Sequence, residues 1–215
     1  MDKMSGANPL REFPHDIYEK HMGHEKVQQL QTLSRITGDQ FALVANIRRP
    51  TVALLGTTDG NGLCNIPAGC CETIIGMDIN EEYLNICRER HSAMSELVLH
   101  SIDLMAEKDR AVELLKPADI VIANMVVEHI HLDNFVEIVC KLTKPIVSVT
   151  IQFNPDGHTV SHSGYEAAFD DILQHGQNCD EVLLIAAMRG AGYEAIGRKE
   201  YILPNEKIFI RLDFK

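Results

Sequence analysis

Glycines and polar residues follow four consecutive apolar runs of this sequence, at places where ligands commonly meet a sheet of parallel strands. The first run, residues 51–55, leads into the loop GTTDG at residues 56–60. The next three runs lead into Asp78, Asp103 and Asn124. Ligands of open α/β sheets bind beyond the carboxyl ends of the strands, near the point where the strand order reverses. The pattern therefore predicts one site assembled from four strand ends.

The residue types at these strand ends suit a nucleoside. Glycines in the first loop let the backbone approach a ligand and present its N–H groups. Asp78 stands eighteen residues beyond Gly60, where an acid can accept both hydroxyls of a ribose. Asp103 can accept from an adenine amine, and Ile102 beside it offers a flat apolar contact. A lone acid at a strand end is also commonly a helix cap or a loop residue.

The elements that carry these residues alternate in a way that predicts a doubly wound α/β fold. Apolar, β-rich runs at residues 51–56, 73–79, 96–104, 118–127 and 145–151 are interleaved with helical stretches at 80–91, 105–115 and 133–142. This order is typical of βαβ units and a mostly parallel sheet. Only Pro-Asn-Glu separates the last two runs, 193–203 and 207–215, which is too short for a parallel crossover. We therefore expect an antiparallel C-terminal hairpin.

The first fifty residues are predicted to be helical. Val27, Leu30, Leu33 and Ile36 recur at the spacing of an amphipathic helix, and Arg48-Arg49-Pro50 ends it. Further along the chain, Asn80 and Asp133 are expected to be helix N-caps. We expect residues 1–50 to form a helical cap segment and residues 51–215 to form the main domain.

Composition restricts the class of protein. The chain is 45% apolar and 24% charged, with a net charge of −11, and shows no basic stripe of the kind that nucleic-acid binding needs. No stretch approaches the roughly 20 apolar residues of a membrane span, and the first residues do not resemble a secretory signal. The six cysteines form no C-x-x-C pair. We expect reduced thiols, a cytoplasmic location, and neither nucleic-acid nor membrane partners; the oligomeric state is not indicated.

The order of these features resembles the class I S-adenosylmethionine-dependent methyltransferases. The resemblance rests on the glycine loop, "GMDINEEYL", the acid after the third strand, "ANMVVEHI" and the C-terminal hairpin, and it covers about residues 40–215. It implies a seven-stranded, Rossmann-like sheet with an N-terminal helical cap, and S-adenosylmethionine as cofactor. The residues expected to bind the cofactor are Tyr18, Gly56, Thr57, Thr58, Gly60, Asp78, Ile79, Ile102, Asp103, Asn124 and Met125.

The resemblance also implies roles for some of these residues. Gly56 and Gly60 would line the methionine part of the cofactor, Asp78 would hold the ribose, and Ile102 with Asp103 would hold the adenine. The Asn124 backbone would approach the amino group, and Tyr18 would close over the cofactor.

Two residues depart from the family pattern. Thr58 stands where the middle glycine of the loop is usual, and Leu54 stands where an acid usually precedes the first glycine. A Cβ at position 58 restricts backbone approach, and Leu54 removes a polar anchor for the methionine ammonium. Both changes bear on affinity for the cofactor more than on the fold.

The expected function is in-line methyl transfer to a small-molecule acceptor, helped by a base where the nucleophile is protonated. His129 follows the fourth strand, and His158 and His162 follow the fifth, so these three histidines are the candidate catalytic residues. The His158–His162 spacing lies in a stretch with Gly, Pro and Ser, which is no convincing helix, so no metal site is predicted.

Two alternative functions stay open. A nicotinamide-dependent oxidoreductase is disfavoured by the absence of G-x-G-x-x-G and by the terminal hairpin. A methyltransferase-like protein that binds the cofactor without catalysis is suggested by Leu54 and Thr58, because a fold does not by itself imply a function.

The role expected of Asp78 is directly testable. We expect Asp78→Ala to weaken nucleoside binding by about 1–3 kcal/mol, because buried ribose hydroxyls would lose their acceptor. Isothermal titration calorimetry on the folded variant measures this. An unchanged affinity would place the ribose elsewhere.

Overall fold

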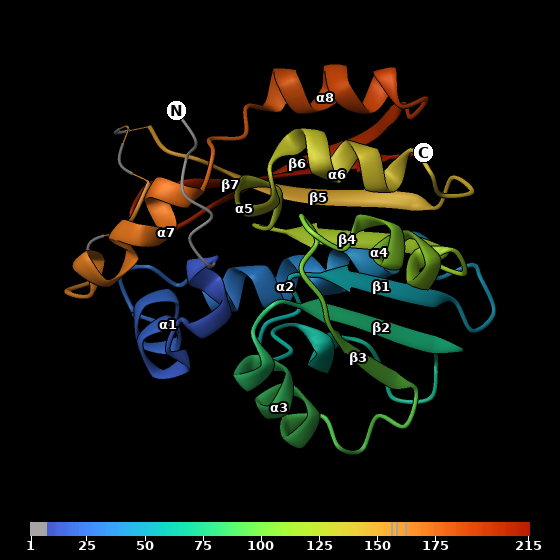
Figure 1. Cartoon of the computed structure of the whole chain (residues 1–215), viewed down its shortest axis with the longest axis horizontal. Helices are drawn as coiled ribbons and strands as arrows, with labels where there is room; N and C mark the ends of the chain where they lie inside the picture. Colours follow the sequence, from blue (N-terminus) through green and yellow to red (C-terminus); the bar gives the residue numbers. More distant parts are fainter. Residues whose placement is uncertain (1–7, 156, 158, 162) are drawn as a thin grey trace.

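A single seven-stranded sheet organises the chain, in the order β3-β2-β1-β4-β5-β7-β6 (Figure 1). The structure is a computed structural model that describes residues 8–155, 157, 159–161 and 163–215. The strands are β1 (Thr51–Leu55), β2 (Thr73–Asp78), β3 (Leu97–Ser101), β4 (Ile120–Asn124), β5 (Ile146–Phe153), β6 (Ala195–Ile202) and β7 (Ile208–Phe214). The first five strands pair in parallel, whereas β7 pairs antiparallel with both β5 and β6. The predicted doubly wound sheet with an antiparallel C-terminal hairpin is confirmed.

Eight α-helices and four 3₁₀-helices connect the strands in the described part of the chain. The α-helices are α1 (His15–Met22), α2 (Gln29–Phe41), α3 (Glu81–Arg90), α4 (Lys108–Leu115), α5 (Val127–Ile130), α6 (Leu132–Val139), α7 (Asp170–His175) and α8 (Glu181–Gly190). The 3₁₀-helices are η1 (Pro9–Glu12), η2 (Ala42–Val44), η3 (Leu63–Asn65) and η4 (Glu166–Phe169).

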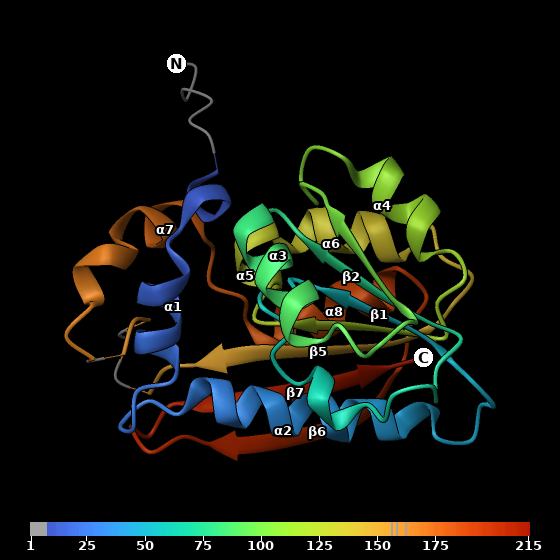
Figure 2. The ribbon, with the colours of Figure 1, turned by 90° about the horizontal axis from the view of Figure 1, so that it is seen from below.

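The sheet buries both of its faces, because side chains alternate along each strand. In β1, Ala53 and Leu55 point into a core that also holds apolar residues of α4, α6 and α8. Val52 and Leu54 point to the other face, into a second core with residues of η2, η3 and α3. Helix α2 runs along β6 and β7 (Figure 2), where its Leu33 and Ile36 pack with Tyr201 and Phe209.

The carboxyl ends of the parallel strands lie at one edge, where α1 and α7 also lie (Figure 1, left). The strand order reverses between β1 and β4, which pair with each other while their chain neighbours lead away to opposite sides. Such a switch point opens a crevice between the loops that follow the two strands. The fold thus places the loop after β1 and the loop after β4 around one space.

The N-terminal segment differs from the single long helix that its spacing suggested. Helix α1 ends at Gly23, whose N–H donates to the Glu19 carbonyl, and Gln28 takes a left-handed conformation with φ of 49° just before α2. The apolar periodicity that began at Val27 therefore starts in a turn and continues in α2. The division of the chain at residue 50 into a cap and a main domain stays a prediction.

The starts of α3 and α6 test the two predicted N-caps. Asn80 caps α3, since its Oδ1 accepts from the backbone N–H groups of Glu82 and Tyr83, as predicted. The prediction that Asp133 is an N-cap was wrong, because α6 begins one residue earlier, at Leu132, and its first turn contains Asp133. Strand β4 ends at Asn124, where Met125 turns left-handed with φ of 55°, so the apolar residues beyond it enter α5 rather than the strand.

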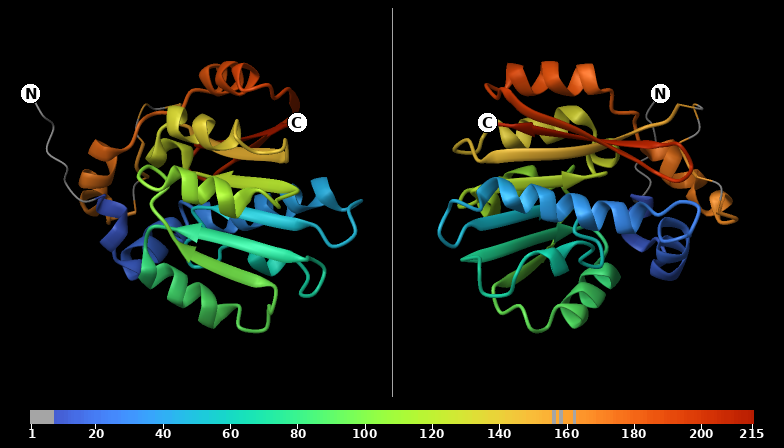
Figure 3. Two further views of the ribbon diagram at one scale, coloured as in Figure 1. Left: turned by 45° about the vertical axis from the view of Figure 1, so that its right-hand side comes forward. Right: turned by 180° about the vertical axis from the view of Figure 1, so that it is seen from behind.

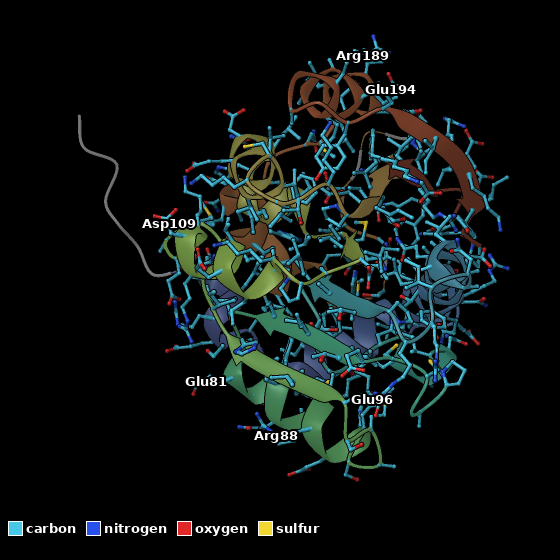
Figure 4. The ribbon with its side chains drawn as sticks, turned by 90° about the vertical axis from the view of Figure 1, so that its right-hand side faces the viewer. Glu81, Arg88, Glu96, Asp109, Arg189 and Glu194 are labelled. Carbon is cyan, nitrogen blue, oxygen red and sulfur yellow. The ribbon has the colours of Figure 1, made fainter. Side chains whose placement is uncertain are left out.

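The outer surface carries charged side chains together with exposed apolar ones, such as Val182 of α8 and Ile202 of β6. Charged side chains such as Glu81 and Arg88 of α3 and Asp109 of α4 point outward (Figure 4). All six cysteines are free. Within the described ranges, no helix has the length and apolar character needed to cross a bilayer.

Asn80 has a second role that a variant can expose. Its Nδ2 donates to the carbonyls of Leu10 (3.0 Å) and Phe13 (3.1 Å), which joins α3 to the N-terminal segment. We expect Asn80→Ala to cost about 1 kcal/mol for the lost cap, plus roughly 0.5–1.5 kcal/mol for each lost hydrogen bond. It should also speed proteolysis between residues 8 and 22.

Asp180→Ala is the matched control, because Asp180 caps α8 through the same two backbone contacts without touching the N-terminal segment. Denaturant unfolding and limited proteolysis compare the two variants. Equal losses of stability and equal cleavage would show that Asn80 does not hold the N-terminal segment.

Candidate functional site

A cavity of about 230 Å³ lies at the carboxyl edge of the sheet, enclosed by strand ends, the N-terminal segment and α7. Figure 3 shows α1 and α7 beside one another at this edge. The cavity wall contains most of the residues expected to bind the cofactor: Tyr18, Gly56, Thr57, Thr58, Asp78, Ile79, Ile102, Asp103, Asn124 and Met125. His129 lines it as well. Residues from five separate parts of the sequence thus meet in one space.

Gly60, the remaining residue of the predicted set, does not line the cavity. Its Cα faces α3: a Cβ built there would lie 2.6 Å from the His91 ring and 2.8 Å from Cys87 Sγ. Its φ of 87° also favours glycine. Gly60 therefore serves the close packing of the loop on α3.

Asp78 joins the two sides of the site. Its Oδ2 accepts from the Thr58 N–H at 2.8 Å, and its Oδ1 accepts from the Asn80 N–H at 2.9 Å. Burial raises the pKa of this carboxyl to about 6, although the N–H groups of Asn80, Thr58 and Ile79 oppose the rise. A carboxylate has about four acceptor sites and these three N–H groups use three of them, so Asp78 can still accept from a ligand in the cavity.

The two residues that depart from the family pattern both line this cavity. Thr58 has a φ of 50°, the left-handed region where a glycine would be unstrained. Leu54 is buried in the apolar core beneath α3 and η3, and gives the cavity an apolar floor. The backbone at position 58 therefore has the left-handed conformation that a glycine would favour, although the residue is Thr58. Leu54 supplies no charge to the cavity.

The acid after β3 is partly engaged within its own loop. Asp103 Oδ1 accepts from the N–H groups of Met105 (2.9 Å) and Ala106 (3.2 Å), which is the loop-residue role weighed from the sequence. Its Oδ2 faces Arg11 at 3.5 Å. Ile102 beside it is 2% exposed and lines the cavity.

The Asn124 side chain is held in place by α2. It exchanges two hydrogen bonds with the Gln40 amide, at 2.8 and 3.0 Å, and donates to Thr37 Oγ1 at 3.2 Å. These contacts fix the turn at the end of β4, so that the backbone of Asn124 and Met125 borders the cavity.

Three rings cluster near Asp78. The Tyr83 ring packs against His15 at 5.4 Å between centroids and against Tyr18 at 5.3 Å. Tyr83 is 5% exposed and lines the cavity, yet its hydroxyl has no hydrogen-bond partner within the described ranges. Burial, and the nearby Tyr18 and Asp78, raise its pKa, so the hydroxyl stays protonated. A buried, unpartnered hydroxyl in a cavity wall is a ready contact for a polar ligand.

An ion-pair network attaches α1 to the rest of the site. His15 Nε2 lies 3.0 Å from Asp59 Oδ2, and Arg90 of α3 pairs with both Asp59 and Glu19. His15, Glu19 and Asp59 are also residue types that bind metals, with ligand atoms within 4.8 Å of one another. The Arg90 guanidinium already pairs with both acids. These contacts therefore join α1 to the loop after β1 and to α3.

Two histidines, His21 of α1 and His129 of α5, line the cavity. Burial lowers the pKa of both His129 and His21 to about 4, so both rings are neutral at pH 7. His21 Nδ1 lies 2.6 Å from Ser163 Oγ, whereas the His129 ring has no hydrogen-bond partner among the described residues. The other two candidate catalytic residues, His158 and His162, lie outside the described residues.

Glu128 precedes His129 but is not part of the cavity wall. Its Oε1 accepts from the Gln152 N–H at 3.2 Å, and its buried Oε2 has no hydrogen-bond partner in the part of the chain that the structure describes. Burial raises the pKa of this carboxyl to about 7.

Sequence spacing did not reveal Tyr83, His15, His21 or Phe169. Phe169 contacts Phe13 at 4.8 Å and His21 at 4.3 Å between ring centroids, which joins the segment before α7 to the N-terminal segment. Only Tyr83 had a local signal, because it lies in the first turn of the helix that follows Asp78.

Comparison with known proteins identifies the fold. No protein-family model matches the chain, and no curated protein matches it. It is similar to magnesium protoporphyrin IX methyltransferase of Synechocystis, solved with bound S-adenosylmethionine, at a TM-score of 0.68 and 12% identity, with 99% of each chain covered. The same enzyme with bound S-adenosylhomocysteine gives a TM-score of 0.68 at 13% identity, with 95% of each chain covered.

Two further structures extend this similarity. A methyltransferase of Leishmania major that depends on S-adenosylmethionine gives a TM-score of 0.66 at 9% identity, over 96% of this chain and 80% of that one. The [4+2]-cyclase SpnF gives 0.62 at 12% identity, over 88% of this chain and 82% of that one. The chain has the fold of the class I S-adenosylmethionine-dependent methyltransferases.

The unpartnered Tyr83 hydroxyl leads to a prediction. Tyr83→Phe removes a buried group that makes no hydrogen bond, so the free energy of unfolding should stay equal or rise slightly. Binding of S-adenosylhomocysteine, used as the probe of the cavity, should weaken roughly three- to tenfold if the hydroxyl meets the ligand. Denaturant unfolding and calorimetry measure the two quantities.

Tyr193→Phe is the control, since the Tyr193 hydroxyl donates to the Val139 carbonyl at 3.2 Å in the core. This variant should lose about 1 kcal/mol of stability and keep its affinity. A Tyr83→Phe variant that is destabilised like the control, with full affinity, would contradict the assignment.

Proposed function

We propose that the protein binds S-adenosylmethionine in this cavity and transfers its methyl group to a small molecule. The observation that carries the proposal is the buried Asp78 carboxylate in the cavity wall, fixed by backbone N–H groups and accompanied by the unpartnered Tyr83 hydroxyl. The structures similar to this chain that were solved with S-adenosylmethionine or S-adenosylhomocysteine support the choice of nucleoside.

The residues present fit the nucleoside half of this cofactor. Asp78 and Tyr83 would hold the ribose hydroxyls, and Ile79 and Ile102 offer apolar contacts for the adenine. Asp103 has Oδ2 free of backbone contacts, although Arg11 faces it. Tyr18 stands in the wall beside Tyr83, where it would cover the sugar.

The methionine half would be held by neutral groups. Leu54 gives no charge, while Gln29, Asn61, Asn124 and Gln152 line the cavity with amides or the adjoining backbone. Gly56 has a φ of 67°, which turns the loop backbone at the end of β1. Neutral amides can both donate to a carboxylate and accept from an ammonium.

Methyl transfer would need few groups from the protein. When bound, the cofactor supplies an electrophilic methyl group on a sulfonium. His129 lines the cavity with a neutral ring that lacks a hydrogen-bond partner among the described residues, so it can take a proton from an acceptor hydroxyl. The buried wall excludes water and holds the acceptor in place.

We also propose that residues 1–50 act as the cap of the site and residues 51–215 as the methyltransferase domain. The contacts that Asn80, Asp59 and Arg90 make with η1 and α1 support this division of roles. We propose that the protein works in the cytoplasm, with its thiols reduced.

A second candidate is binding of the cofactor without methyl transfer. Leu54 favours it, because an anchor for the methionine ammonium is missing, and the similarity to SpnF, a [4+2]-cyclase, shows that this fold also carries other chemistry. A nicotinamide-dependent oxidoreductase is less well supported, since β7 lies antiparallel between β5 and β6.

Transfer of an isotopically labelled methyl group tests the proposal. The protein is incubated with methyl-labelled S-adenosylmethionine and a panel of small hydroxyl, amine and thiol acceptors. We expect labelled product with at least one acceptor, and a loss of roughly 10²–10⁴-fold in kcat for His129→Ala at unchanged affinity for S-adenosylhomocysteine. Tight binding with no transfer to any acceptor would favour the second candidate.

The raised pKa of Asp78 predicts a pH dependence of cofactor binding. Ribose hydroxyls donate to the ionised carboxylate, and the carboxyl titrates with a pKa of about 6. Affinity for S-adenosylhomocysteine should therefore fall as the pH is lowered through about 6, roughly tenfold between pH 8 and pH 5. Calorimetry at several pH values measures this. Asp78→Asn should remove the dependence, and an equally steep fall in that variant would assign it to another group.

A further inference from the structure

One part of the cavity wall, formed by the N-terminal segment and α7, is built from rings and aliphatic side chains. Phe169 packs against both Phe13 and His21, and all three line the cavity. Ile172 and Leu173 of α7 continue this wall, which we name the α7 wall: Phe13, His21, Phe169, Ile172 and Leu173. Helix α7 lies opposite α1 at the open edge of the sheet (Figure 2).

No lysine or arginine lines the cavity in the described part of the chain. Nearby cations are already engaged: Arg11 pairs with Asp103 of the wall, and Lys207 donates from Nζ to the Thr159 carbonyl at 2.7 Å. His21 and His129 are neutral at pH 7 because burial lowers their pKa values. A carboxylate or phosphate against the α7 wall would lose its water without gaining an opposite charge from a side chain, which is strongly unfavourable.

The acids of the cavity increase this bias against anions. Asp78 and Asp103 are the carboxylates in its wall, at the ends of β2 and β3. Among the polar side chains of the wall, the His129 ring has no hydrogen-bond partner in the described part of the chain. A neutral imidazole beside an apolar wall suits a single hydroxyl on an apolar molecule.

We propose that the acceptor is an uncharged aromatic compound with one reactive hydroxyl, whose ring lies against the α7 wall and whose hydroxyl meets His129. This inference rests on the proposed function, since it names the acceptor class of the same cavity. It excludes carboxylated and phosphorylated acceptors.

A matched pair of probes tests the proposal by binding, without a need for turnover. The full chain is saturated with S-adenosylhomocysteine and then titrated with 2-naphthol, which is uncharged at pH 7, or with 2-naphthoate, which has the same rings and one negative charge. We expect 2-naphthol to bind at least about tenfold more tightly. Equal or tighter binding of 2-naphthoate, or no binding of 2-naphthol, would overturn the proposal.

Two variants locate the effect at the α7 wall. Leu173 is 40% exposed, so Leu173→Arg should fold, and it should strengthen binding of 2-naphthoate severalfold by supplying the missing charge. Val182→Arg adds the same charge on α8, at a side chain that is 72% exposed and outside the cavity wall, and should change nothing. Equal responses of the two variants would place the probe elsewhere.

The binding of S-adenosylhomocysteine itself separates this inference from the proposed function. If the nucleoside does not bind, the proposed function fails before the acceptor is considered. If it binds and the naphthol preference is absent, only the acceptor class is wrong.

Discussion

The site depends on one buried carboxylate. Asp78 accepts from the backbone of Thr58 on one side and of Asn80 on the other, so the loop after β1 and the start of α3 are fixed relative to the end of β2. Asn80 then carries this constraint to the N-terminal segment through the carbonyls of Leu10 and Phe13. Burial disfavours the ionised form of Asp78, and the hydrogen bonds from backbone N–H groups offset this only in part. Hydrogen bonds from the hydroxyl groups of a ligand would stabilise the carboxylate further.

The cavity is closed by segments that come from opposite ends of the sequence. The N-terminal segment is attached to the β1–α3 side by the pairs His15–Asp59 and Glu19–Arg90, and to α7 through the rings that meet at Phe169. The ion pairs join α1 to the loop after β1 and to α3, and the ring contacts join the N-terminal segment to Phe169 before α7. One short segment thus contacts several of the elements that enclose the cavity.

The sequence predicted those parts of the fold and of the site that depend on local periodicity and on the positions of strand ends. The alternation of runs and the short Pro-Asn-Glu connection were enough for the sheet and its antiparallel hairpin, because parallel crossovers need longer connections. Asp78, Asp103 and Asn124 came together as expected, since the carboxyl ends of parallel strands share one edge. Tyr83, His21 and Phe169 could not be found this way, because their place in the wall depends on how helices and loops pack. Likewise, the break between α1 and α2 covers residues 23–28: Gly23 ends α1, which is a stop signal that the apolar spacing did not register, and the left-handed Gln28 before α2 is a residue type that gives no turn signal.

Calorimetry with S-adenosylmethionine, S-adenosylhomocysteine and NAD, titrated separately into the full chain, tests the central claim that this cavity is a sulfur-nucleoside site. We predict that both sulfur nucleosides bind and that Asp78→Ala weakens both to a similar extent, while NAD gives no heat of binding. Tight binding of NAD, with no response to either sulfur nucleoside, would contradict the account.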